Sequence, residues 1–475
     1  MTYSSLRSKA FALLAALGLV LAGCAGADAA IDSAASGSST SDASSNAASG
    51  ASGSLDSSRV HTVSLTVDDT ALRDMLETYA ETGDKEWIHA SVTVDGETFE
   101  DVGIKLKGNS SLRGISADTP AQELPLRIRL DKYVDGQDYN GISDFTVRSN
   151  NTETSMNEAV ALDLLTEAGL ASTQAIATRF SVNGSEESLR LTVQNLDETW
   201  VEDYFPDAGQ DSVLYKADSE GNWSWLGQDG DYSASFDVEA GDENYQPLIE
   251  LLDLLNNGTQ EEIASQLPEM VDLDSFATYL AFQEIIDNFD DIDGPGNNSY
   301  LFWDSATQMF TVVAWDHNLA FGGMAGGEGG MMEGAPGERP EFDGENPPTG
   351  QAPNFDDENP PTGQAPNLDN ENMPTGERPE FDGDDPAGGG MSRDNPLVTA
   401  FESNEEWTAL YDSKLADLQT TLIDDGALSD SVDAWSQTLT AGASDLVSAE
   451  TIAAEGEAIN DPGSNGAPTT AESSR

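Results

Sequence analysis

The sequence predicts an α+β fold in which a sheet-rich N-terminal half precedes a helical C-terminal half, and three observations support this. From about residue 59, apolar and polar residues alternate between turn signals, which is typical of antiparallel strands. After "SVLYKAD", apolar residues recur at helical spacing instead. A stretch crowded with Pro, Gly and carboxylates, residues 326–394, then separates two parts of the helical half.

The N-terminal half combines predicted hairpins with two helices. Hairpins are predicted about Asp95-Gly96 and Asn183-Gly184, because these dipeptides readily adopt the two-residue turns that join antiparallel strands. Helices are predicted for "DDTALRDMLETYAETG" and "TSMNEAVALDLLTEAGL", each with a glycine near its end. Further strands are predicted for "VHTVSLTVD", "LPLRIRLDKY" and "DFTVRSN". This half is therefore expected to be mostly antiparallel sheet.

The C-terminal half shows helices on both sides of a loop and a hairpin. Helices are predicted for "YQPLIELLDLLNNG" and "DLDSFATYLAFQEIIDN", and Asp272 or Asp274 is suited to cap the second. The loop "FDDIDGPGNN" and the hairpin "SYLFWDSATQMFTVVAWD" follow. Helical spacing resumes in "NPLVTAFESNEEWTALYDSKLADLQTTL" and "LSDSVDAWSQTLTAGASDLV".

The Pro- and Gly-rich stretch is a repeat with a period of 13 residues. Four prolines stand in register: Pro340, Pro353, Pro366 and Pro379. A period this short, dominated by Pro, Gly and carboxylates, lacks the apolar surface for packed units. We therefore predict a disordered insertion, residues 326–394, within a domain formed by residues 59–325 and 395–455. Residues 456–475 are predicted to be a disordered tail.

The N-terminus resembles a bacterial lipoprotein signal. Arg7 and Lys9 precede an apolar run that is short for a bilayer span, and the run ends in "LAGC", which resembles a lipobox. Cys24 is the only cysteine, so we expect it to carry a lipid anchor and expect no intramolecular disulfide. Residues 1–24 are then a signal peptide and residues 25–58 a disordered Ser/Ala/Gly stalk. The protein is expected on the outer face of the cytoplasmic membrane, in contact with lipid through the anchor alone.

The charge of the chain limits its partners. Its 87 acidic residues against 20 basic ones give a formal net charge of −67. Such a field repels nucleic acid and attracts divalent cations, so nucleic-acid binding is excluded and metal ions or cationic surfaces are favoured.

One carboxylate in the segment "VVAWDHNLAFGG", Asp316, stands where a buried strand ends. The loop before the hairpin carries further candidate ligands: Asp290, Asp291, Asp293, Asn297 and Asn298. Phosphoryl transfer from a nucleotide needs a carboxylate near the nucleophile, an amide and a second carboxylate for Mg²⁺, and cations for the phosphates. The order of a helix, an acidic loop, a hairpin and a carboxylate matches this requirement.

The segments "NFDDIDGPGNNSYLFWD" and "FTVVAWDHNLAFGG" resemble the core of the CotH family, atypical kinases first known from spore coats. The resemblance also covers "GIKLKGNSS", "LPLRIRLDKYVDGQDYNGISDFTVRSN", "MNEAVALDLL" and "SVLYKAD", and so spans residues 60–325 and 395–425. It implies a two-lobed protein-kinase-like fold, with an antiparallel sheet-rich N-terminal lobe and a helical C-terminal lobe. It also implies transfer of phosphate from ATP to Ser or Thr of a surface protein.

The resemblance implies roles for five polar residues of the C-terminal half. Asp290 or Asp293 would be the catalytic aspartate: Asp290 forms an Asn-x-Asp pattern with Asn288, and Asp293 stands five residues before Asn298. Asp316 would be the main ligand of Mg²⁺ or Mn²⁺, because a bound cation makes a half-buried carboxylate tolerable. Asn298 and Asn318 would complete the metal shell.

Lysine is scarce, with seven in the chain, so the lysines that remain in the sheet-rich half are candidates for binding phosphates. Lys107 and Lys216 are the best of them, and Glu158 is a candidate partner for a lysine. Many members of the family carry a lysine just before the proline of "LPLRIRL", where this chain has Leu124. Arg127 or Lys107 would then substitute for it.

Other functions also fit parts of the pattern. "DDIDG" is typical of calcium-binding turns, so a non-enzymatic surface lipoprotein that binds calcium or a cell-wall component on the same scaffold is an alternative. A pseudokinase that binds nucleotide without turnover is another. Lys105 and Lys107 alternate along one strand, which is also typical of a solvated face. The three histidines lack metal-ligand spacing, and no Walker loop appears.

Overall fold

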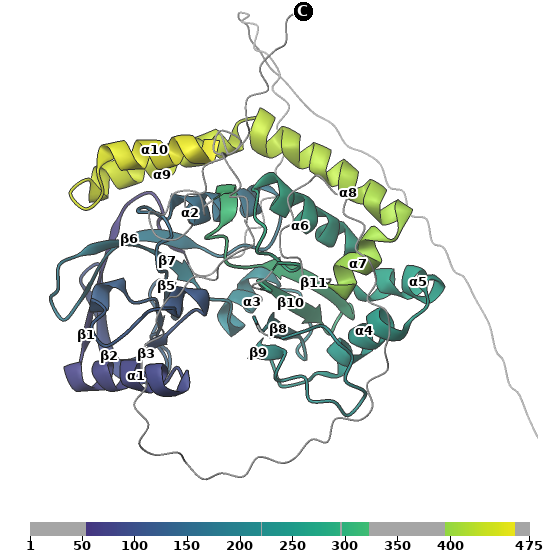
Figure 1. Cartoon of the computed structure of the whole chain (residues 1–475), viewed down its shortest axis with the longest axis horizontal. Coiled ribbons are helices and arrows are strands. Elements are labelled where there is room, and N and C mark those ends of the chain that lie inside the picture. The colour runs from purple at the N-terminus through teal and green to yellow at the C-terminus, as the bar shows by residue number, and fades with distance from the viewer. Residues whose placement is uncertain (1–53, 220, 295–296, 323–394, 461–475) are drawn as a thin grey trace, which may run out of the picture. The chain divides into compact units, whose positions relative to one another are not determined.

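The described part of the chain contains two β-sheets and a set of helices (Figure 1). A computed structural model of the protein describes residues 54–219, 221–294, 297–322 and 395–460. The predicted signal peptide with Cys24, nearly all of the predicted stalk and the predicted insertion lie outside these residues. Within them, no helix combines the length and apolar character needed to cross a membrane.

The sheet-rich half is a closed barrel. Its strands are β1 (His61–Val67), β2 (Ile88–Val94), β3 (Glu97–Leu106), β4 (Leu126–Arg129), β5 (Asp144–Val147), β6 (Ala175–Val182) and β7 (Ser188–Gln194). They close in the order β1-β2-β3-β4-β5-β7-β6. Every pair is antiparallel except β1 with β6, which is parallel. The predicted strands are therefore confirmed, but they form a barrel with one parallel seam rather than an antiparallel sheet.

The local signals explain most element boundaries. Helix α1 (Asp69–Thr82) is capped by the Asp68 carboxylate and ends at Gly83, whose φ of 82° suits glycine. Both predicted hairpins form, with positive φ at both turn residues of Asn183-Gly184 and of Asp95-Gly96. Asp272 rather than Asp274 caps α6.

A second, four-stranded sheet joins the segment "SVLYKAD", after which helices were expected, to the predicted hairpin. Its strands are β8 (Val213–Ala217), β9 (Phe236–Ala240), β10 (Ser299–Asp304) and β11 (Met309–Ala314). Their order is β11-β10-β8-β9, with antiparallel pairing throughout. The predicted β10–β11 hairpin is thus the edge of a larger sheet. The C-terminal half is mixed rather than helical.

Helices cover this second sheet and one side of the barrel (Figure 1). The longer ones are α2 (Met156–Glu167), α3 (Glu198–Tyr204), α4 (Gln246–Asn257), α5 (Gln260–Met270), α6 (Leu273–Ile285), α7 (Pro396–Glu402), α8 (Glu405–Leu418), α9 (Ala427–Ala443) and α10 (Ala449–Asn460). Short helical turns are η1 (Ser110–Leu112), η2 (Ala121–Glu123), η3 (Ala320–Gly322) and η4 (Gln419–Asp424).

Three apolar cores hold these elements together. One fills the barrel, and a second joins α2, the second sheet and the helices on both sides of the insertion. A third packs Trp200 of α3 against side chains of the second sheet and Trp315. Helix α2 is buried almost all round, with Val160, Ala161 and Leu164 fully enclosed. It packs against β6 on one side and against α9 and α10 on the other. The helices after residue 395 therefore share a core with the barrel-side helix that carries Glu158.

Candidate functional site

The β10–β11 hairpin brings Asn298 and Asp316 to the same end of the second sheet. Ser299 at the start of β10 pairs with Ala314 at the end of β11, and paired strands lie about 4.8 Å apart. Asn298 precedes this pair and Asp316 follows it, so the two residues leave the sheet together. Asp316 has a φ of 65°, a left-handed conformation that costs a non-glycine residue about 1–3 kcal/mol and clusters at functional sites.

Arg148, which follows β5, joins Asp316 to Glu158. Its Nη1 lies 3.2 Å from Asp316 Oδ1, and its Nη2 donates a hydrogen bond to Glu158 Oε1 on α2. Its guanidinium carbon lies 4.7 Å from the centroid of the Trp315 ring. The expectation of a lysine partner for Glu158 is wrong, because Arg148 takes this position.

Burial shapes the electrostatics of these charges. It raises the pKa of Glu158, which Arg148 lowers and the negative charge of Asp316 raises again. Burial also opposes the charge of Arg148, but the two carboxylates outweigh it and raise the pKa of the guanidinium. Asp316 Oδ1 is buried and accepts no hydrogen bond from the described residues. Its described partner is the Arg148 guanidinium, whose Nη1 lies 3.2 Å away, and a carboxylate has lone pairs left for a further cation.

Two predicted phosphate ligands, Lys107 and Lys216, lie in the same region. Lys107 Nζ is 5.9 Å from the centroid of the Trp315 ring. Burial, together with the positive charge of Lys216, lowers the pKa of Lys107 to about 7. Lys216 stands on β8 opposite Tyr300 of β10. The end of β3 and the middle of β8 thus bring the two lysines together.

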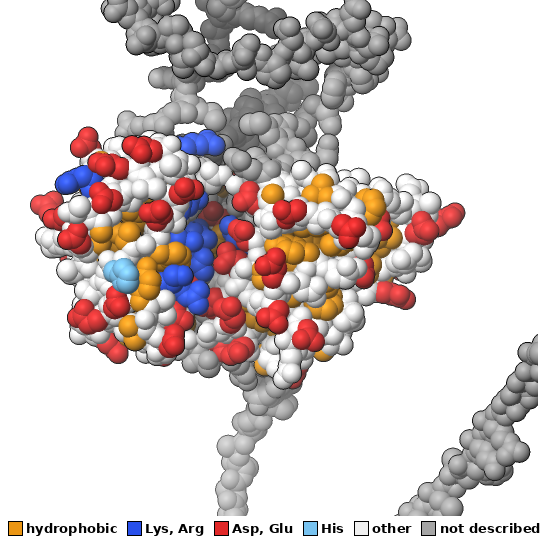
Figure 2. All heavy atoms as spheres, turned by 90° about the horizontal axis from the view of Figure 1, so that it is seen from below, with side chains coloured by type: hydrophobic (Ala, Val, Ile, Leu, Met, Phe, Trp, Pro, Cys, Tyr) orange, Lys and Arg blue, Asp and Glu red, His pale blue; other side chains and the backbone are white. Residues whose placement is uncertain are grey.

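Five lysines form what we call the lysine strip. In the described ranges, the salt bridges belong to arginines, to histidines and to Lys414. The described lysines outside these salt bridges are Lys85, Lys105, Lys107, Lys132 and Lys216. Figure 2 shows lysine and arginine side chains gathered in one strip of a face, with acidic side chains around it. Because neighbouring like charges repel, such a strip in so acidic a chain indicates an anionic ligand.

Arg127 connects the barrel to the second sheet. Its Nε and Nη2 donate hydrogen bonds to the Asp144 carboxylate, at 3.0 and 2.7 Å, and its Nη1 lies 3.4 Å from Glu239 on β9. A pocket of about 390 Å³ lies between β9 and the barrel. Lys105 and Arg127 form its basic wall, and Asp237, Glu239 and Glu243 add three carboxylates to its lining. Two carboxylates neutralise Arg127, so it is a weaker phosphate ligand than Lys107.

The acidic turn before β10 places its three aspartates in different surroundings. The carbonyl of Asp290 accepts a hydrogen bond from Asn298 Nδ2 at 3.0 Å. The carboxylate of Asp293 accepts one from the backbone N–H of Asn395 at 2.9 Å, at the start of α7. Burial raises the pKa of Asp291 to about 6. The sequence assigned Asp291 no catalytic role, although its raised pKa marks it as a candidate proton acceptor.

The donor groups near Asp316 include few carboxylates. They suit an ion that needs one or two carboxylates, as magnesium does, better than an ion held by several. The Asn298 amide nitrogen is turned to the Asp290 carbonyl, so the amide oxygen faces away from it. The carbonyl of Asn318 accepts a hydrogen bond from Asn157 Nδ2 at 2.7 Å, which ties this segment to α2. In the part of the chain that the structure describes, no three His, Cys, Asp or Glu side chains are grouped to hold a metal ion. Magnesium sites commonly use one or two carboxylates plus phosphate oxygens and water.

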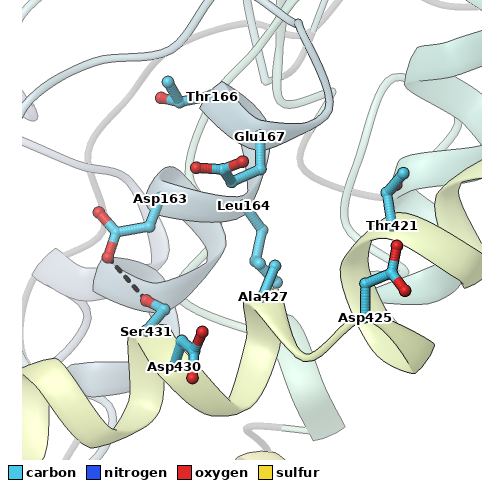
Figure 3. A pocket seen from close by; sticks show the side chains of 9 residues that line it. All are labelled: Asp163, Leu164, Thr166, Glu167, Thr421, Asp425, Ala427, Asp430 and Ser431. Carbon is cyan, nitrogen blue, oxygen red and sulfur yellow. Dashed lines mark hydrogen bonds between the residues drawn. The ribbon is translucent and has the colours of Figure 1, made fainter. Parts of the chain in front are cut away.

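A second pocket, of about 530 Å³, lies between α2 and α9 and is acidic (Figure 3). Its carboxylates are Asp163, Glu167, Asp425 and Asp430. Asp163 already accepts hydrogen bonds from Ser431 Oγ at 2.6 Å and from Trp435 Nε1 at 2.8 Å. The lining contains no lysine or arginine, so this pocket repels a nucleotide.

Arg148 is the main site residue that sequence reasoning missed. Its only signal was that it ends the apolar strand "DFTVRSN" as a lone cation, as Asp316 ends "FTVVAWD" as a lone anion. Two opposite charges at the ends of two buried strands suggest a contact, but the barrel pairing that brings them together has no local sequence signal.

Comparisons with known proteins agree with this arrangement. The family model described as CotH kinase protein matches residues 104–448, which include the barrel strands from β3 onward, the hairpin and α9. The chain is also 24% identical to inner spore coat protein H of Bacillus subtilis (strain 168) over 174 residues, 35% of this chain and 46% of that protein. The match thus spans less than half of that relative. Because the family model covers most of the chain, the protein belongs to the CotH kinase protein family.

Proposed function

We propose that this protein is an atypical protein kinase that transfers phosphate from ATP to Ser or Thr hydroxyls of surface proteins, with Mg²⁺ or Mn²⁺ bound. Its family supports a kinase-like activity. The observation that carries the proposal is the meeting of Lys107, Arg148 and Asp316 around Trp315. Phosphoryl transfer needs cations for the phosphates beside a carboxylate for the metal.

In this proposal the basic residues have distinct roles. Lys107 and Lys216, which form no salt bridge among the described residues, bind the phosphates as point charges. Arg148 and Glu158 position Asp316, since the guanidinium contacts both carboxylates. Arg127 holds β4 against β9 and so maintains the basic wall of the pocket.

Asp290 is the proposed acceptor of the hydroxyl proton. Asp293 is bonded to the backbone of Asn395, which suits it to holding the start of α7. Asp291, with its raised pKa, is the alternative proton acceptor within the same turn.

Asp316 would hold the divalent cation, with Asn298 and Asn318 supplying amide oxygens. When bound, the cation neutralises charge on the transferred phosphate. The Asp316 carboxylate, which is paired with Arg148 and has lone pairs left for a cation, supports this assignment. Calcium would fit the same oxygen donors, and it is therefore included in the test below.

We also propose that the protein is exported and held on the outer face of the cytoplasmic membrane by a lipid on Cys24. The signal-like N-terminus supports this part of the proposal. Metabolic labelling with a radioactive fatty acid, lost in Cys24→Ala, would test it.

Nucleotide binding is tested by thermal stabilisation with a non-hydrolysable ATP analogue and Mg²⁺. We expect about 2.7 kcal/mol of stabilisation at a hundred times the dissociation constant, with much less in Asp316→Asn and Lys107→Met. Lys414→Met is the matched control, because Lys414 pairs with Asp274 outside the site. Stabilisation by calcium alone, with no effect of nucleotide, would favour the calcium-binding alternative.

Catalysis is tested by transfer of radiolabel from ATP to protein. We expect Asp290→Asn to abolish transfer while stabilisation by nucleotide persists, and Asp293→Asn to lower the melting temperature while retaining transfer. Nucleotide binding without any transfer in the unsubstituted protein would identify a pseudokinase. Transfer that survives Asp290→Asn but not Asp291→Asn would move the catalytic role to Asp291.

A further inference from the structure

The outer part of the lysine strip runs along one face of β3, away from Asp316. Gly103, Lys105 and Lys107 alternate with buried apolar residues, so they share a face and follow one another at about 6.6 Å. In the barrel, Lys105 pairs with Arg127 and Gly103 with Arg129 on the neighbouring strand β4. The strip therefore has a regular spacing along an extended backbone.

Trp87 and Lys132 form the outer end of this row. The Nζ atoms of Lys105 and Lys132 lie 4.8 and 5.0 Å from the centroid of the Trp87 ring. A Cβ at Gly103 would lie 2.5 Å from Lys132 Cγ and 3.0 Å from Trp87 Cε3. The glycine is thus required for the lysine and the indole to lie over β3. This packing fixes two ammonium groups on one half-buried ring.

Holding these lysines close together in their charged form costs free energy. Burial lowers the pKa of Lys105, and Arg127 lowers it further. Burial also lowers the pKa of Lys85, and Lys216 lowers it further. Carboxylates are plentiful in the chain, yet in the described residues none forms a salt bridge with these lysines. The buried carboxylate of Glu239 offsets part of the charge of Lys105, Lys107 and Lys216, but it lies beyond salt-bridge distance from them, and the positive charge that remains favours an anionic ligand.

We propose that Lys132, Trp87 and Lys105 bind an extended acidic segment of the protein acceptor and direct its hydroxyl toward Lys107 and Asp316. Alternate side chains of an extended peptide are also about 6.6 Å apart, so acidic residues at every second position match the lysine row. An apolar residue of the peptide would pack on Trp87. This inference rests on the proposed kinase function and names its substrate class.

Charge complementarity favours a peptide of this kind over the other anionic partners. Nucleic acid is disfavoured by the overall charge of −67. In the proposed function a nucleotide binds Lys107 and Lys216. Lys132 packs over Gly103, which is four residues and about 13 Å along β3 from Lys107. An anionic cell-wall polymer carries the same charge, and competition with polyphosphate in the test below distinguishes it from a peptide.

The test is fluorescence anisotropy with short labelled peptides, without nucleotide. One peptide carries glutamate at alternate positions around a serine, an isomer carries the same glutamates in one block, and a third has lysine in place of glutamate. We expect the alternating peptide to bind best, its affinity to fall with salt, and the lysine peptide not to bind. Equal binding of the alternating and blocked isomers would overturn the extended-strand geometry.

Lys132→Glu is expected to weaken binding of the alternating peptide about fivefold to tenfold. Arg73→Glu is the matched control, an exposed charge reversal on α1 with no salt bridge among the described residues, and it should leave binding unchanged. Equal loss in both variants would mean that only net charge matters and would overturn the site. Displacement of the peptide by polyphosphate at the same concentration of negative charge would also overturn the site. Since no nucleotide is present, failure of the kinase proposal would leave these results intact.

Discussion

At the scale of single residues, the site depends on how a few buried charges are balanced. Arg148 and Glu158 are 8% and 1% exposed, so the folded protein would be strongly destabilised if either residue lost the other as its partner. Removing one partner of a buried pair costs about 3–5 kcal/mol, whereas removing both can be nearly neutral. Arg148 therefore has a role in stability in addition to positioning Asp316.

This balance predicts a pH-dependent loss of stability in Arg148→Met. We expect the free energy of unfolding to fall by about 3–5 kcal/mol at pH 8, and by less at pH 5. The pKa of Glu158 is raised in the folded state, and loss of Arg148 raises it further. The stability that depends on a neutral Glu158 is fully present below the pKa of this residue in the unfolded state. It is lost as the pH rises through the pKa in the folded state. Urea denaturation at both pH values measures the difference.

Two comparisons make the result specific to the buried pair. The double variant Arg148→Met with Glu158→Met should recover much of the lost stability. Arg129→Met is the control, because Arg129 and its partner Asp131 are about a third exposed and such pairs contribute less than about 1 kcal/mol. A loss in Arg148→Met that is equal at pH 5 and pH 8 would show that the buried carboxylate is not its cause.

At the scale of elements, prediction succeeded where the signal is local. Caps, glycine stops and Asp-Gly or Asn-Gly turns identified α1 and both barrel hairpins, because each depends on residues that are neighbours in the chain. Helix α5 was missed because its sequence, "QEEIASQLPEM", is polar and contains Pro268. Barrel closure was missed because β1 and β6 pair across more than a hundred residues, and pairing at that distance leaves no periodicity in either strand.

The candidate site was likewise predictable only where its residues are close in the chain. Asp316 and Asn298 were found because one hairpin carries both. The contact of Asp316 with Arg148 requires β5 of the barrel to lie against the second sheet. The partner of Glu158 could not be identified from sequence, because lysine and arginine serve equally well in a pattern and differ only in reach and geometry.

Helix α9 offers a test of how the helices after the insertion pack on the barrel. A glycine-to-alanine change inside a helix normally stabilises it by about 0.5–1 kcal/mol. At Gly442, however, a Cβ would lie 2.5 Å from Val60 Cγ2 and 2.7 Å from its Cβ. We expect Gly442→Ala to destabilise the protein by about 1 kcal/mol or more, measured by urea denaturation.

Gly456→Ala in α10 is the matched comparison. There the nearest atom, Val432 Cγ1, would be 3.1 Å from the new Cβ, so a smaller loss or a slight gain is expected. Stabilisation by Gly442→Ala of the size usual for a helix would show that α9 does not lie against the segment before β1.

At the scale of the whole molecule, charge is distributed very unevenly. The chain has a net charge of −67, yet the described lysines that form no salt bridge lie together in one strip (Figure 2). Repulsion among acidic groups elsewhere opposes compaction, while the strip provides one region where an anion is attracted. Binding of anionic ligands at the strip is therefore expected to weaken at high salt.

The described residues on either side of the insertion are hydrogen-bonded to the chain segment between the end of α6 and β10. The backbone N–H of Phe321 donates a hydrogen bond to the Ile286 carbonyl at 2.6 Å. After the insertion, Asn395 is bonded to Asp293 and to the carbonyl of Ile292. The two ends thus reach one short stretch of chain. The described fold needs only a short connection between them.

Replacing residues 326–391 by a short Gly–Ser linker should therefore leave the fold intact. Shortening the connection by about three doublings of length should raise the free energy of unfolding by about 2 kcal/mol, because less loop-closure entropy is lost. A Gly–Ser linker of the original length is the control and should match the unsubstituted protein in urea denaturation. If both replacements lower stability equally, the repeat sequence itself contributes contacts to the fold; if only the short linker does so, the two ends lie too far apart for it.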